Sequence, residues 1–363
     1  MTIGTAFEYV SRGKSPNYVE NSFIRVINQA CIYWDGITYS KVKYQDETKV
    51  KPDAVLQNGD ILITSTGTGT LGRCAVFLDP NDGYKYMADS HVTILRNSKK
   101  YLPRFLAYFF MSDTVQNDLY LTCVNGSTNQ IELSKDKLKR FSLPCISMDD
   151  QKMIVSQLSW IDSLVSLRKQ QLAKLDELVK ARFVEMFGNP LKNDKGMPTV
   201  SGEALFKLSN GKTLPNSKRF SEGIPAYGGN GISWYTDEIL CDYDTIIVGR
   251  VGFQSGNVHL AKAPLWVTDN AMYISSINSR DCDIRFLCAL MEHIDFTRYQ
   301  DAGDLKKITQ KPFMQMQYLM PPMLLQKKYI AFVEQVDKSK LAIQQSLDKL
   351  ETLKKSLMQK YFG

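Results

Sequence analysis

The sequence of 363 residues holds few of the residues that build metal sites or disulfide frameworks. Its three histidines are not paired at helical spacing, and its seven cysteines include no Cys-x-x-Cys pair. An odd number of scattered cysteines is typical of a reducing compartment. We therefore expect a cytoplasmic protein with no metal site, disulfide framework or structural zinc.

The sequence also lacks long apolar runs. Its longest strongly apolar stretch, Phe105 to Met111, is far shorter than the about 20 residues that cross a bilayer. The first residues have neither the basic start nor the apolar core of a signal peptide. With 44% hydrophobic and 23% charged residues, the composition excludes a disordered or fibrous protein, and the length predicts two or three domains.

The net charge of +7 is small and unevenly placed. Residues 1–143 hold 17 basic and 14 acidic residues, residues 321–363 hold 8 and 4, and charge is balanced between these two stretches. This excess is compatible with a polyanionic partner, but charge alone does not decide the function.

Two stretches of 38 residues, 151–188 and 326–363, repeat each other without a gap at a separation of 175 positions. Eleven positions are identical, and both copies end in Phe-Gly. The identical pairs are Gln151 and Gln326, Lys152 and Lys327, Asp162 and Asp337, Gln170 and Gln345, Leu172 and Leu347, Lys174 and Lys349, Leu175 and Leu350, Leu178 and Leu353, Lys180 and Lys355, Phe187 and Phe362, and Gly188 and Gly363.

Each copy carries apolar residues at alternating spacings of three and four, which predicts a helix packed against another helix. Arg168, Arg182, Lys340 and Lys354 interrupt the two stripes, and we expect them to set the register or to face a further helix. The expected coiled-coil residues are Ile154, Leu158, Ile161, Val165, Leu172, Leu175, Val179 and Met186 in the first copy, and Tyr329, Val333, Val336, Ile343, Leu347, Leu350, Leu357 and Tyr361 in the second.

The segments before the two helices repeat more faintly. Ser11-Arg-Gly-Lys14 parallels Ser209-Asn-Gly-Lys212, and Asp89-Ser90 is aligned with Asp269-Asn270. Short β-branched runs, broken by Gly and Asn and joined by helices such as Arg104 to Leu119, predict an α+β fold for each segment.

Three motifs follow one another in the second variable segment: Ile224-Pro-Ala-Tyr-Gly-Gly-Asn-Gly231, Ile246-Ile-Val-Gly-Arg-Val-Gly252 and Trp266-Val-Thr-Asp-Asn-Ala-Met272. Together with the two helices that end in Phe-Gly, they make nearly the whole chain resemble the specificity subunit of a Type I restriction-modification enzyme. In the first variable segment, Ile24 to Cys31 stands in place of the Tyr-Gly-Gly-Asn loop. The resemblance therefore implies a DNA target whose two halves differ.

The resemblance implies two pseudo-repeated α/β target-recognition domains, separated by two long helices that form an antiparallel coiled coil. The expected domain boundaries are 1–143 for the first recognition domain, 144–188 for the central helix, 189–320 for the second recognition domain and 321–363 for the C-terminal helix.

The function that the resemblance implies is that of a noncatalytic subunit in a DNA methylation complex. It would bind double-stranded DNA and two methyltransferase subunits, and through these the restriction subunits. S-adenosylmethionine, ATP and magnesium would belong to the partner subunits. The 33 residues from Ile154 to Met186 make about 50 Å of helix. Because such a rod would separate the two recognition domains, we expect a bipartite, asymmetric target with a fixed unspecified spacer.

Catalytic motifs offer a weaker alternative. Gly67-Thr-Gly-Thr-Leu-Gly72 has the Gly-x-Gly-x-x-Gly spacing of a dinucleotide site, which requires a helix directly after it. Arg73 to Leu78 is typical of a strand instead, so we expect a glycine-rich hairpin or a DNA-facing loop here. A Type IIB-like specificity subunit is the second reading, and a nucleotide-binding enzyme that uses Gly67 to Gly72 is the third.

Candidate DNA contacts are polar and basic residues in the loops, because such side chains bind base edges and phosphates. They are Arg12, Lys14, Thr68, Thr70, Arg73, Ser127, Asn129 and Gln130 in the first domain, and Lys212, Tyr227, Asn230, Arg250, Gln254, Asn257, Lys306 and Lys307 in the second.

Overall fold

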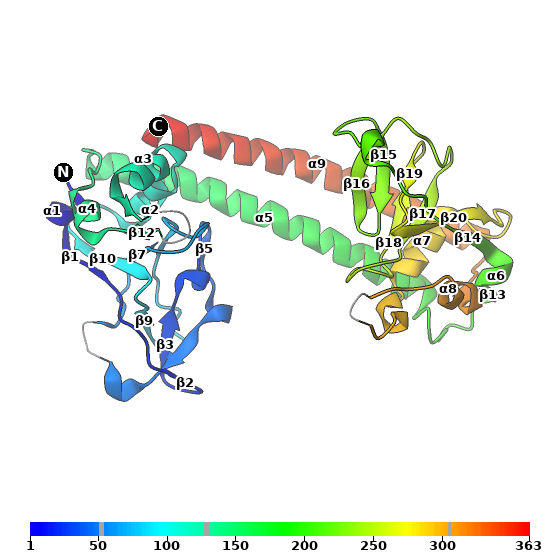
Figure 1. Ribbon diagram of the computed structural model, residues 1–363, viewed down its shortest axis with the longest axis horizontal. Coiled ribbons are helices and arrows are strands. Elements are labelled where there is room, and N and C mark those ends of the chain that lie inside the picture. Colours follow the sequence, from blue (N-terminus) through cyan, green and yellow to red (C-terminus); the bar gives the residue numbers. More distant parts are fainter. Residues whose placement is uncertain (51–53, 127–130, 304–305) are drawn as a thin grey trace. The chain divides into compact units, whose positions relative to one another are not determined.

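The computed structural model describes residues 1–363 except 51–53, 127–130 and 304–305. The chain forms two compact units (Figure 1). Unit 1 comprises Met1–Lys169 with Ser346–Gly363, and unit 2 comprises Gln170–Gln345. The fold is α+β, as the sequence predicted.

The core of unit 1 is a four-stranded antiparallel sheet in the order β1-β10-β7-β8. The strand β7 is buried at all four positions, because it lies inside the sheet and its Ile-Leu-Ile-Thr sequence is apolar enough for burial on both faces. The four strands are β1 (Phe7–Arg12), β7 (Ile61–Thr64), β8 (Cys74–Val76) and β10 (Val92–Ser98).

Unit 1 contains further strands and helices in addition to this sheet. A second sheet has the order β2-β6-β3-β9, with β3 parallel to β9. The remaining elements are α1 (Ile3–Ala6), β2 (Tyr18–Val19), β3 (Ile24–Ile27), β4 (Ile32–Tyr33), β5 (Gly36–Ile37), β6 (Lys43–Gln45), β9 (Lys85–Ala88), α2 (Pro103–Met111), α3 (Asp113–Cys123), β11 (Val124–Asn125), β12 (Glu132–Leu133) and α4 (Lys135–Arg140).

Unit 2 repeats the four-stranded sheet in the order β14-β20-β17-β18. As in unit 1, a neighbouring sheet holds one parallel pair, here β15 and β19. The elements of unit 2 are β13 (Thr199–Ser201), α6 (Gly202–Leu205), β14 (Phe206–Asn210), β15 (Ile224–Gly228), β16 (Gly231–Thr236), β17 (Thr245–Gly249), β18 (Val258–Ala261), β19 (Trp266–Val267), β20 (Ala271–Ile277), α7 (Ile284–Glu292), α8 (Lys311–Gln315) and β21 (Gln317–Leu319).

Two helices of 40 residues each contribute to both units: α5 (Met148–Phe187) and α9 (Met323–Phe362). In unit 1, Asp162 of α5 pairs with Lys354 of α9, and Gln157 accepts a hydrogen bond from Tyr361. Residue numbers rise along one helix as they fall along the other, so these stretches are antiparallel. Among the helices in the described part of the chain, none has both the length and the apolar composition to span a membrane.

The repeated Phe-Gly ends occupy equivalent places in the two units. Phe187 ends α5 and packs against Phe286 and Tyr329 in unit 2. Phe362 ends α9 and packs against Phe105 and Phe109 in unit 1. Each helix therefore closes the core of one unit with its last buried ring.

The helix expected over Arg104 to Leu119 is two helices, α2 and α3, so this prediction was wrong. Ser112 separates them with an extended ψ of 136°. Its N–H donates to the carbonyl of Phe109 and closes α2, while its own carbonyl accepts from Gln116 and opens α3. The apolar pattern runs through this break, which is why it did not reveal the turn.

Candidate nucleic-acid interface

The hairpin turn after β7 in unit 1 and that after β17 in unit 2 are equivalent. In unit 2 the N–H of Gly256 donates to Gly249 across the turn, and in unit 1 the N–H of Gly72 donates to Thr64. Gly67 and Gly252 take the same place near the start of each turn, with φ of 94° and 96°. The Gly67 to Gly72 segment thus joins two antiparallel strands, which contradicts the dinucleotide-site reading.

Arg250 begins the unit 2 turn and is tied to two neighbouring segments. Its N–H donates to the carbonyl of Asn270 at 2.9 Å, and its guanidinium donates to the carbonyl of Asp269 at 3.3 Å. Its own carbonyl accepts from Ile308 at 3.0 Å. The residue is half-buried, so its backbone is fixed by these bonds while part of the residue remains accessible to solvent.

Glycines bring the unit 2 loops together backbone to backbone. A Cβ on Gly249 would lie 2.6 Å from the carbonyl oxygen of Gly229 and 2.8 Å from that of Gln254. The Tyr-Gly-Gly-Asn and Gly-Arg motifs therefore meet, which explains why both require glycine at the contact.

The segment after the first strand is duplicated in detail. Gly13 and Gly211 both pack against the carbonyls of the turn that precedes β10 and β20, at distances that no Cβ could occupy. Directly after them, the N–H of Lys14 donates to Ala88 and that of Lys212 donates to Val267. These two lysines therefore hold equivalent exposed positions at the same end of each unit.

The register corrects one sequence alignment. The N–H of Asp89 donates to Ile27, and that of Thr268 donates to Tyr227. Asp89 is thus equivalent to Thr268, one position before the Asp269 with which the sequence alignment paired it. By the same register, His91 in unit 1 is equivalent to Asn270 in unit 2.

In unit 1 the corresponding loops carry different polar groups. The hydroxyl of Thr66 shares a hydrogen bond with Nδ1 of His91 at 2.8 Å and donates to Oε1 of Gln29 at 3.1 Å. Burial raises the pKa of the Asp89 carboxyl, although the His91 N–H donates to it at 2.9 Å.

The predicted contact residues differ in exposure and in the bonds that their side chains make. Six are exposed, and unlike Arg250 none of them has a side-chain hydrogen bond to the backbone of the described residues: Lys14, Thr68, Lys212, Asn230, Gln254 and Lys307. Lys306 and Asn257 are half-buried in the same loops as Lys307 and Gln254. Ser127, Asn129 and Gln130 lie outside the described residues.

Four predicted contacts also support the fold. Arg12 donates to the carbonyl of Leu133 at 2.8 Å and pairs with Glu132 at 3.3 Å. Arg73 donates to Gly69 and Thr70 donates to Thr66, so both hold the turn in shape. Tyr227 packs against the apolar cluster around Ala261 and Leu265.

The DNA contacts predicted from the sequence do not include Gln29, His91, Asn270 or Phe253. The first three are polar residues of turns whose roles depend on loops that are distant in the sequence. Phe253 is 91% exposed at the tip of the unit 2 turn. An exposed ring between Gly252 and Gln254 was the available signal.

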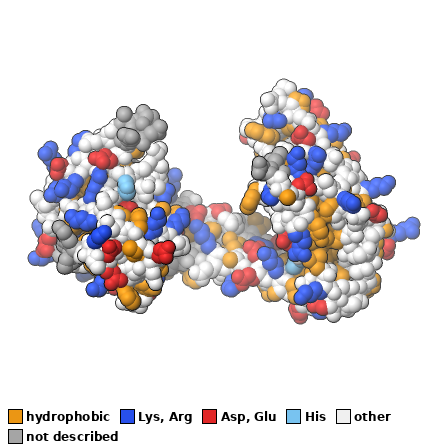
Figure 2. Space-filling model, turned by 60° about the horizontal axis from the view of Figure 1, so that its bottom comes forward, with side chains coloured by type: hydrophobic (Ala, Val, Ile, Leu, Met, Phe, Trp, Pro, Cys, Tyr) orange, Lys and Arg blue, Asp and Glu red, His pale blue; other side chains and the backbone are white. Residues whose placement is uncertain are grey.

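Charge on the surface is mixed. Figure 2 shows Lys and Arg side chains on both units with Asp and Glu side chains among them. In unit 2, Asp269 accepts a hydrogen bond from Thr213 at 3.1 Å beside the Arg250 turn. The loops therefore suit selective contacts better than attraction to any polyanion.

The predicted coiled-coil residues are buried or half-buried throughout both stripes. The lysines that interrupt the second stripe reach carboxylates on the first helix. Lys340 pairs with Asp176 at 2.5 Å within unit 2, and Lys354 pairs with Asp162 at 2.6 Å within unit 1. Equal spacing of 14 residues on both helices makes these pairs suited to fixing the register. Phe183, which is fully buried, was missed because it lies beside the stripe.

The identical glutamines of the repeat perform one structural task twice. Gln151 is fully buried, accepts from the N–H of Leu102 at 2.9 Å and donates to Lys100 at 2.9 Å. Gln326, also fully buried, accepts from Asp283 at 2.9 Å and donates to Asp281 at 2.8 Å. Each glutamine fastens a long helix to the loop that opens the neighbouring short helix.

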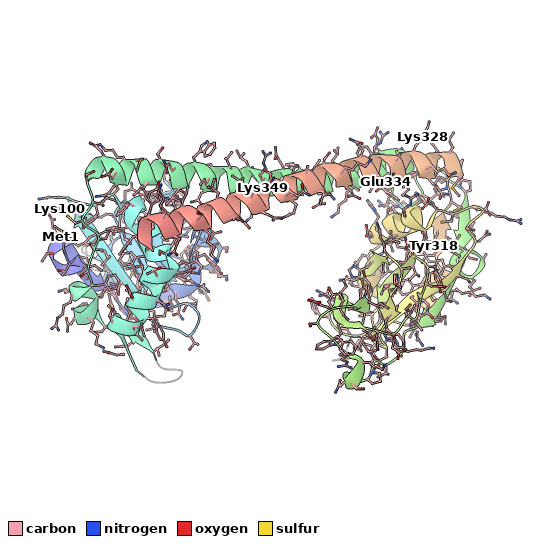
Figure 3. The ribbon with its side chains drawn as sticks, turned by 90° about the horizontal axis from the view of Figure 1, so that it is seen from above. Met1, Lys100, Tyr318, Lys328, Glu334 and Lys349 are labelled. Carbon is pink, nitrogen blue, oxygen red and sulfur yellow. The ribbon has the colours of Figure 1, made fainter. Side chains whose placement is uncertain are left out.

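The second short helix is also joined to α9 by charge. Arg285, near the start of α7, pairs with Glu334 of α9, which is labelled in Figure 3. The same figure labels Tyr318, which is fully buried and donates to the carbonyl of Phe313 at 3.0 Å. The Arg285–Glu334 pair therefore joins the unit 2 stretch of α9 to α7.

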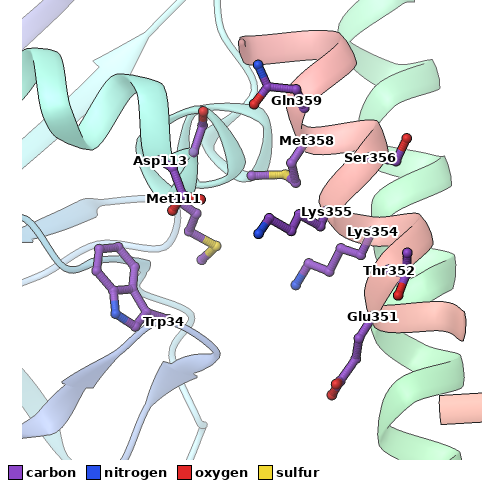
Figure 4. A pocket seen from close by; sticks show the side chains of 11 residues that line it. Trp34, Met111, Asp113, Glu351, Thr352, Lys354, Lys355, Ser356, Met358 and Gln359 are labelled. Atoms are coloured by element: carbon purple, nitrogen blue, oxygen red, sulfur yellow. The ribbon is translucent and has the colours of Figure 1, made fainter. Parts of the chain in front are cut away.

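A cavity of about 550 Å³ lies in unit 1 between the α2–α3 junction and α9 (Figure 4). Trp34, Met111 and Met358 give it apolar walls, and Lys354 and Lys355 line the side formed by α9. An indole and two thioethers suit an apolar side chain, because these groups are large and adaptable.

The family described as the Type I restriction modification DNA specificity domain matches residues 6–177 and 196–354. The chain belongs to this family, and it is of the type I specificity-subunit class.

Curated relatives and a solved structure agree with this assignment. The putative type I restriction enzyme MjaX specificity subunit of Methanocaldococcus jannaschii is 20% identical over 352 residues, which cover 89% of this chain and 82% of the relative. The type I restriction enzyme EcoprrI specificity subunit of Escherichia coli is 24% identical over 262 residues, covering 65% and 61%. The S subunit of a Type-I restriction-modification system from M. genitalium has a similar fold, with a TM-score of 0.60, 16% identity and coverage of 100% of this chain and 95% of that one.

Proposed function

We propose that this chain is a noncatalytic subunit that reads an asymmetric, bipartite DNA target, one half with each unit. The observation that carries this proposal is a duplicated framework with unlike loops. Gly13 and Gly211 pack in the same way, and Lys14 and Lys212 follow them, yet the neighbouring turns carry Thr66 with His91 in one unit and Arg250 with Asn270 in the other.

The difference between these loops is a difference in hydrogen-bonding chemistry. A guanidinium is a donor that matches guanine in the major groove, whereas hydroxyl, amide and imidazole groups match other base edges. One framework with two sets of side chains therefore supports the reading of two different half-targets.

The proposal includes a fixed spacer between the half-targets. Helix α5 is continuous over 40 residues and contributes to both units, which corresponds to about 60 Å of helix. Insertion of one heptad into α5, with a matching heptad in α9, should change the spacer length. An unchanged spacer in a folded variant would contradict this part of the proposal.

We place the methyltransferase subunits on surface residues that the repeat keeps identical although they are exposed. Leu178 in unit 2 and Leu353 in unit 1 are 47% and 45% exposed. The exposed Lys174 and Lys349 each lie one helical turn before these leucines. Burial within this chain does not account for these identities, and two equivalent patches suit two copies of one partner.

Restriction subunits would join through the methyltransferase. S-adenosylmethionine, ATP and magnesium would bind to those partners, which would carry the catalysis.

The partner patches can be tested by Leu178→Glu and Leu353→Glu, each of which should remove one of two bound methyltransferase subunits. Two retained partners in both variants would contradict this placement. Exposed Leu121 to Glu serves as the control, since it lies outside the repeat.

The experiment for DNA reading is a map of methylated positions in DNA modified by the chain together with its methyltransferase. We expect one motif with two unlike specified halves and an unspecified spacer of constant length. A continuous motif, or methylation without sequence preference, would contradict the proposed function.

A further inference from the structure

Phe253 is the most exposed of the large hydrophobic residues in the described chain, at 91%. It lies at the tip of the turn between β17 and β18, next to the loop segments that hold Arg250, Lys306 and Lys307. Exposure of an entire phenyl ring costs solvation free energy that burial against a partner would recover. The ring is therefore a candidate contact rather than a structural residue.

The backbone of the turn that carries this ring is fixed by hydrogen bonds. Nε2 of Gln300 donates to the carbonyl of Ser255 at 2.7 Å and to that of Phe253 at 3.5 Å. The N–H of Gly252 donates to Lys306 at 2.8 Å, and the N–H of Ser255 donates to Gly252 at 3.0 Å. Since the loop is fixed by these bonds, the ring is presented without an ordering cost for the backbone.

Packing beneath the turn fixes it further. Ser255 is fully buried, and a Cβ on Gly256 would lie 3.0 Å from Cβ of Phe296. Gly252 and Gly256 both have positive φ, 96° and 97°, so the turn depends on glycine at two points. Only the outer side of the turn is free, and Phe253 occupies it.

We propose that Phe253 inserts between neighbouring bases of the half-target read by unit 2 and partly unstacks them. The inference rests on the proposed function and adds a named contact to it. Apolar side chains act as wedges at base steps when cationic neighbours hold the flanking phosphates, and Lys306 and Lys307 supply cations here. The equivalent position in unit 1 is Thr68, so this wedge belongs to one half of the target.

The surroundings favour DNA over a protein partner. Phe253 is flanked in the sequence by Gly252 and Gln254, so its direct neighbours add no large apolar side chain to it. Lys306 and Lys307 come from a separate segment that is bonded to the same turn, through Gly252 and Val251. An exposed ring beside cations and amides is typical of a surface that stacks on bases.

The test compares Phe253→Ala, Phe253→Trp and the wild type, each assembled with the methyltransferase. The probe is duplex target DNA with 2-aminopurine placed in turn at each position of the half-target. Binding of wild type should raise the fluorescence at one base step, and Phe253→Trp should preserve the unstacking. Phe253→Ala should abolish it and weaken binding to the target about tenfold to a hundredfold.

Phe23→Ala is the matched control, because Phe23 is also exposed, at 71%, but lies in unit 1 outside the turns described above. It should leave affinity and fluorescence unchanged. Wild-type affinity in Phe253→Ala, or a fluorescence increase that survives the loss of the ring, would overturn the wedge and leave the proposed function intact. A wild-type complex without sequence-specific binding would instead refute both.

Discussion

Gly67 in unit 1 and Gly252 in unit 2 hold equivalent places near the start of the turn, yet Thr68 follows the first and Phe253 follows the second. The strands on either side pair in the same order, β10-β7-β8 and β20-β17-β18. The turns thus differ in chemistry while their supports are alike. The side chains of equivalent turns can therefore differ while the strands that support them keep their order.

Residues shared by both units serve the framework wherever the structure explains them. Gln151 and Gln326 satisfy loop backbones, and Phe187 and Phe362 fill cores. The residues that differ between the units include Thr68 and Phe253 in the equivalent turns. One scaffold can therefore support two specificities without a change of fold.

The largest expected effect comes from the paired phenylalanines. Phe187→Ala should destabilise unit 2, and Phe362→Ala should destabilise unit 1, each by about 3–5 kcal/mol, because a buried ring leaves a cavity. Hydrogen exchange measured by mass spectrometry should show faster exchange mainly in the affected unit. Equal loss of protection in both units would contradict the separate cores, and the exposed Leu178→Ala is the control.

The buried glutamines should give the next largest effect. Gln326→Leu leaves the N–H of Asp283 and the carbonyl of Asp281 without their partner, which costs about 1–3 kcal/mol for each of these groups that water cannot reach. The matched change Gln151→Leu should do the same to Leu102 and Lys100. Thermal unfolding should show that the two variants are destabilised by similar amounts. A neutral result for one alone would break the equivalence of the units.

Arg250→Ala sharpens the comparison at the level of specificity. We expect a loss of about 1–3 kcal/mol in discrimination at one position of the half-target read by unit 2, because one arginine contact to a base is worth about that much. Competition binding between matched and substituted targets measures this loss. Unchanged affinity and unchanged target preference would remove Arg250 from the interface, and Lys14→Ala should affect the other half only.

The smallest predicted effect is a pH dependence at the start of α7. Burial opposes ionisation of Asp283, but hydrogen bonds from Arg285 and from backbone N–H groups outweigh it and lower the pKa of this carboxyl. A lowered pKa adds stability above the ordinary carboxyl value near about 4, and this stability is lost as pH falls through the folded-state pKa.

Asp283→Asn should therefore cost about 1 kcal/mol at pH 7 and progressively less below pH 4. The measurement is the difference in unfolding temperature between variant and wild type across this range. A constant difference would show that ionisation of Asp283 adds nothing. The exposed Asp149, which opens α5, provides a comparison at another helix start.

The sequence was sufficient to predict features that depend on local periodicity. The long helices, their duplicated Phe-Gly ends and the hairpin after Ile63 follow from apolar spacing and from turn residues. Lys14 and Lys212 could be paired because their flanking glycines are shared. These features depend on residues close to one another in the chain.

Features that depend on distant contacts could not be predicted in the same way. The turn at Ser112 directly follows the apolar run Phe105 to Met111, and the helical spacing of apolar residues continues beyond it at Val115 and Leu119. The pairing of Asp89 with Thr268 rests on strand register, which a one-residue shift in the loop conceals. Thr66 finds His91 and Gln29 only after three segments fold together.

The central claim is that each unit reads its own half of the target. The most direct measurement is a methylation map for a chain in which residues 199–319 also replace residues 2–142. The account predicts that both specified halves acquire the sequence now read by unit 2, while the half now read by unit 1 disappears. Retention of the original asymmetric target by the folded, assembled variant would contradict the account.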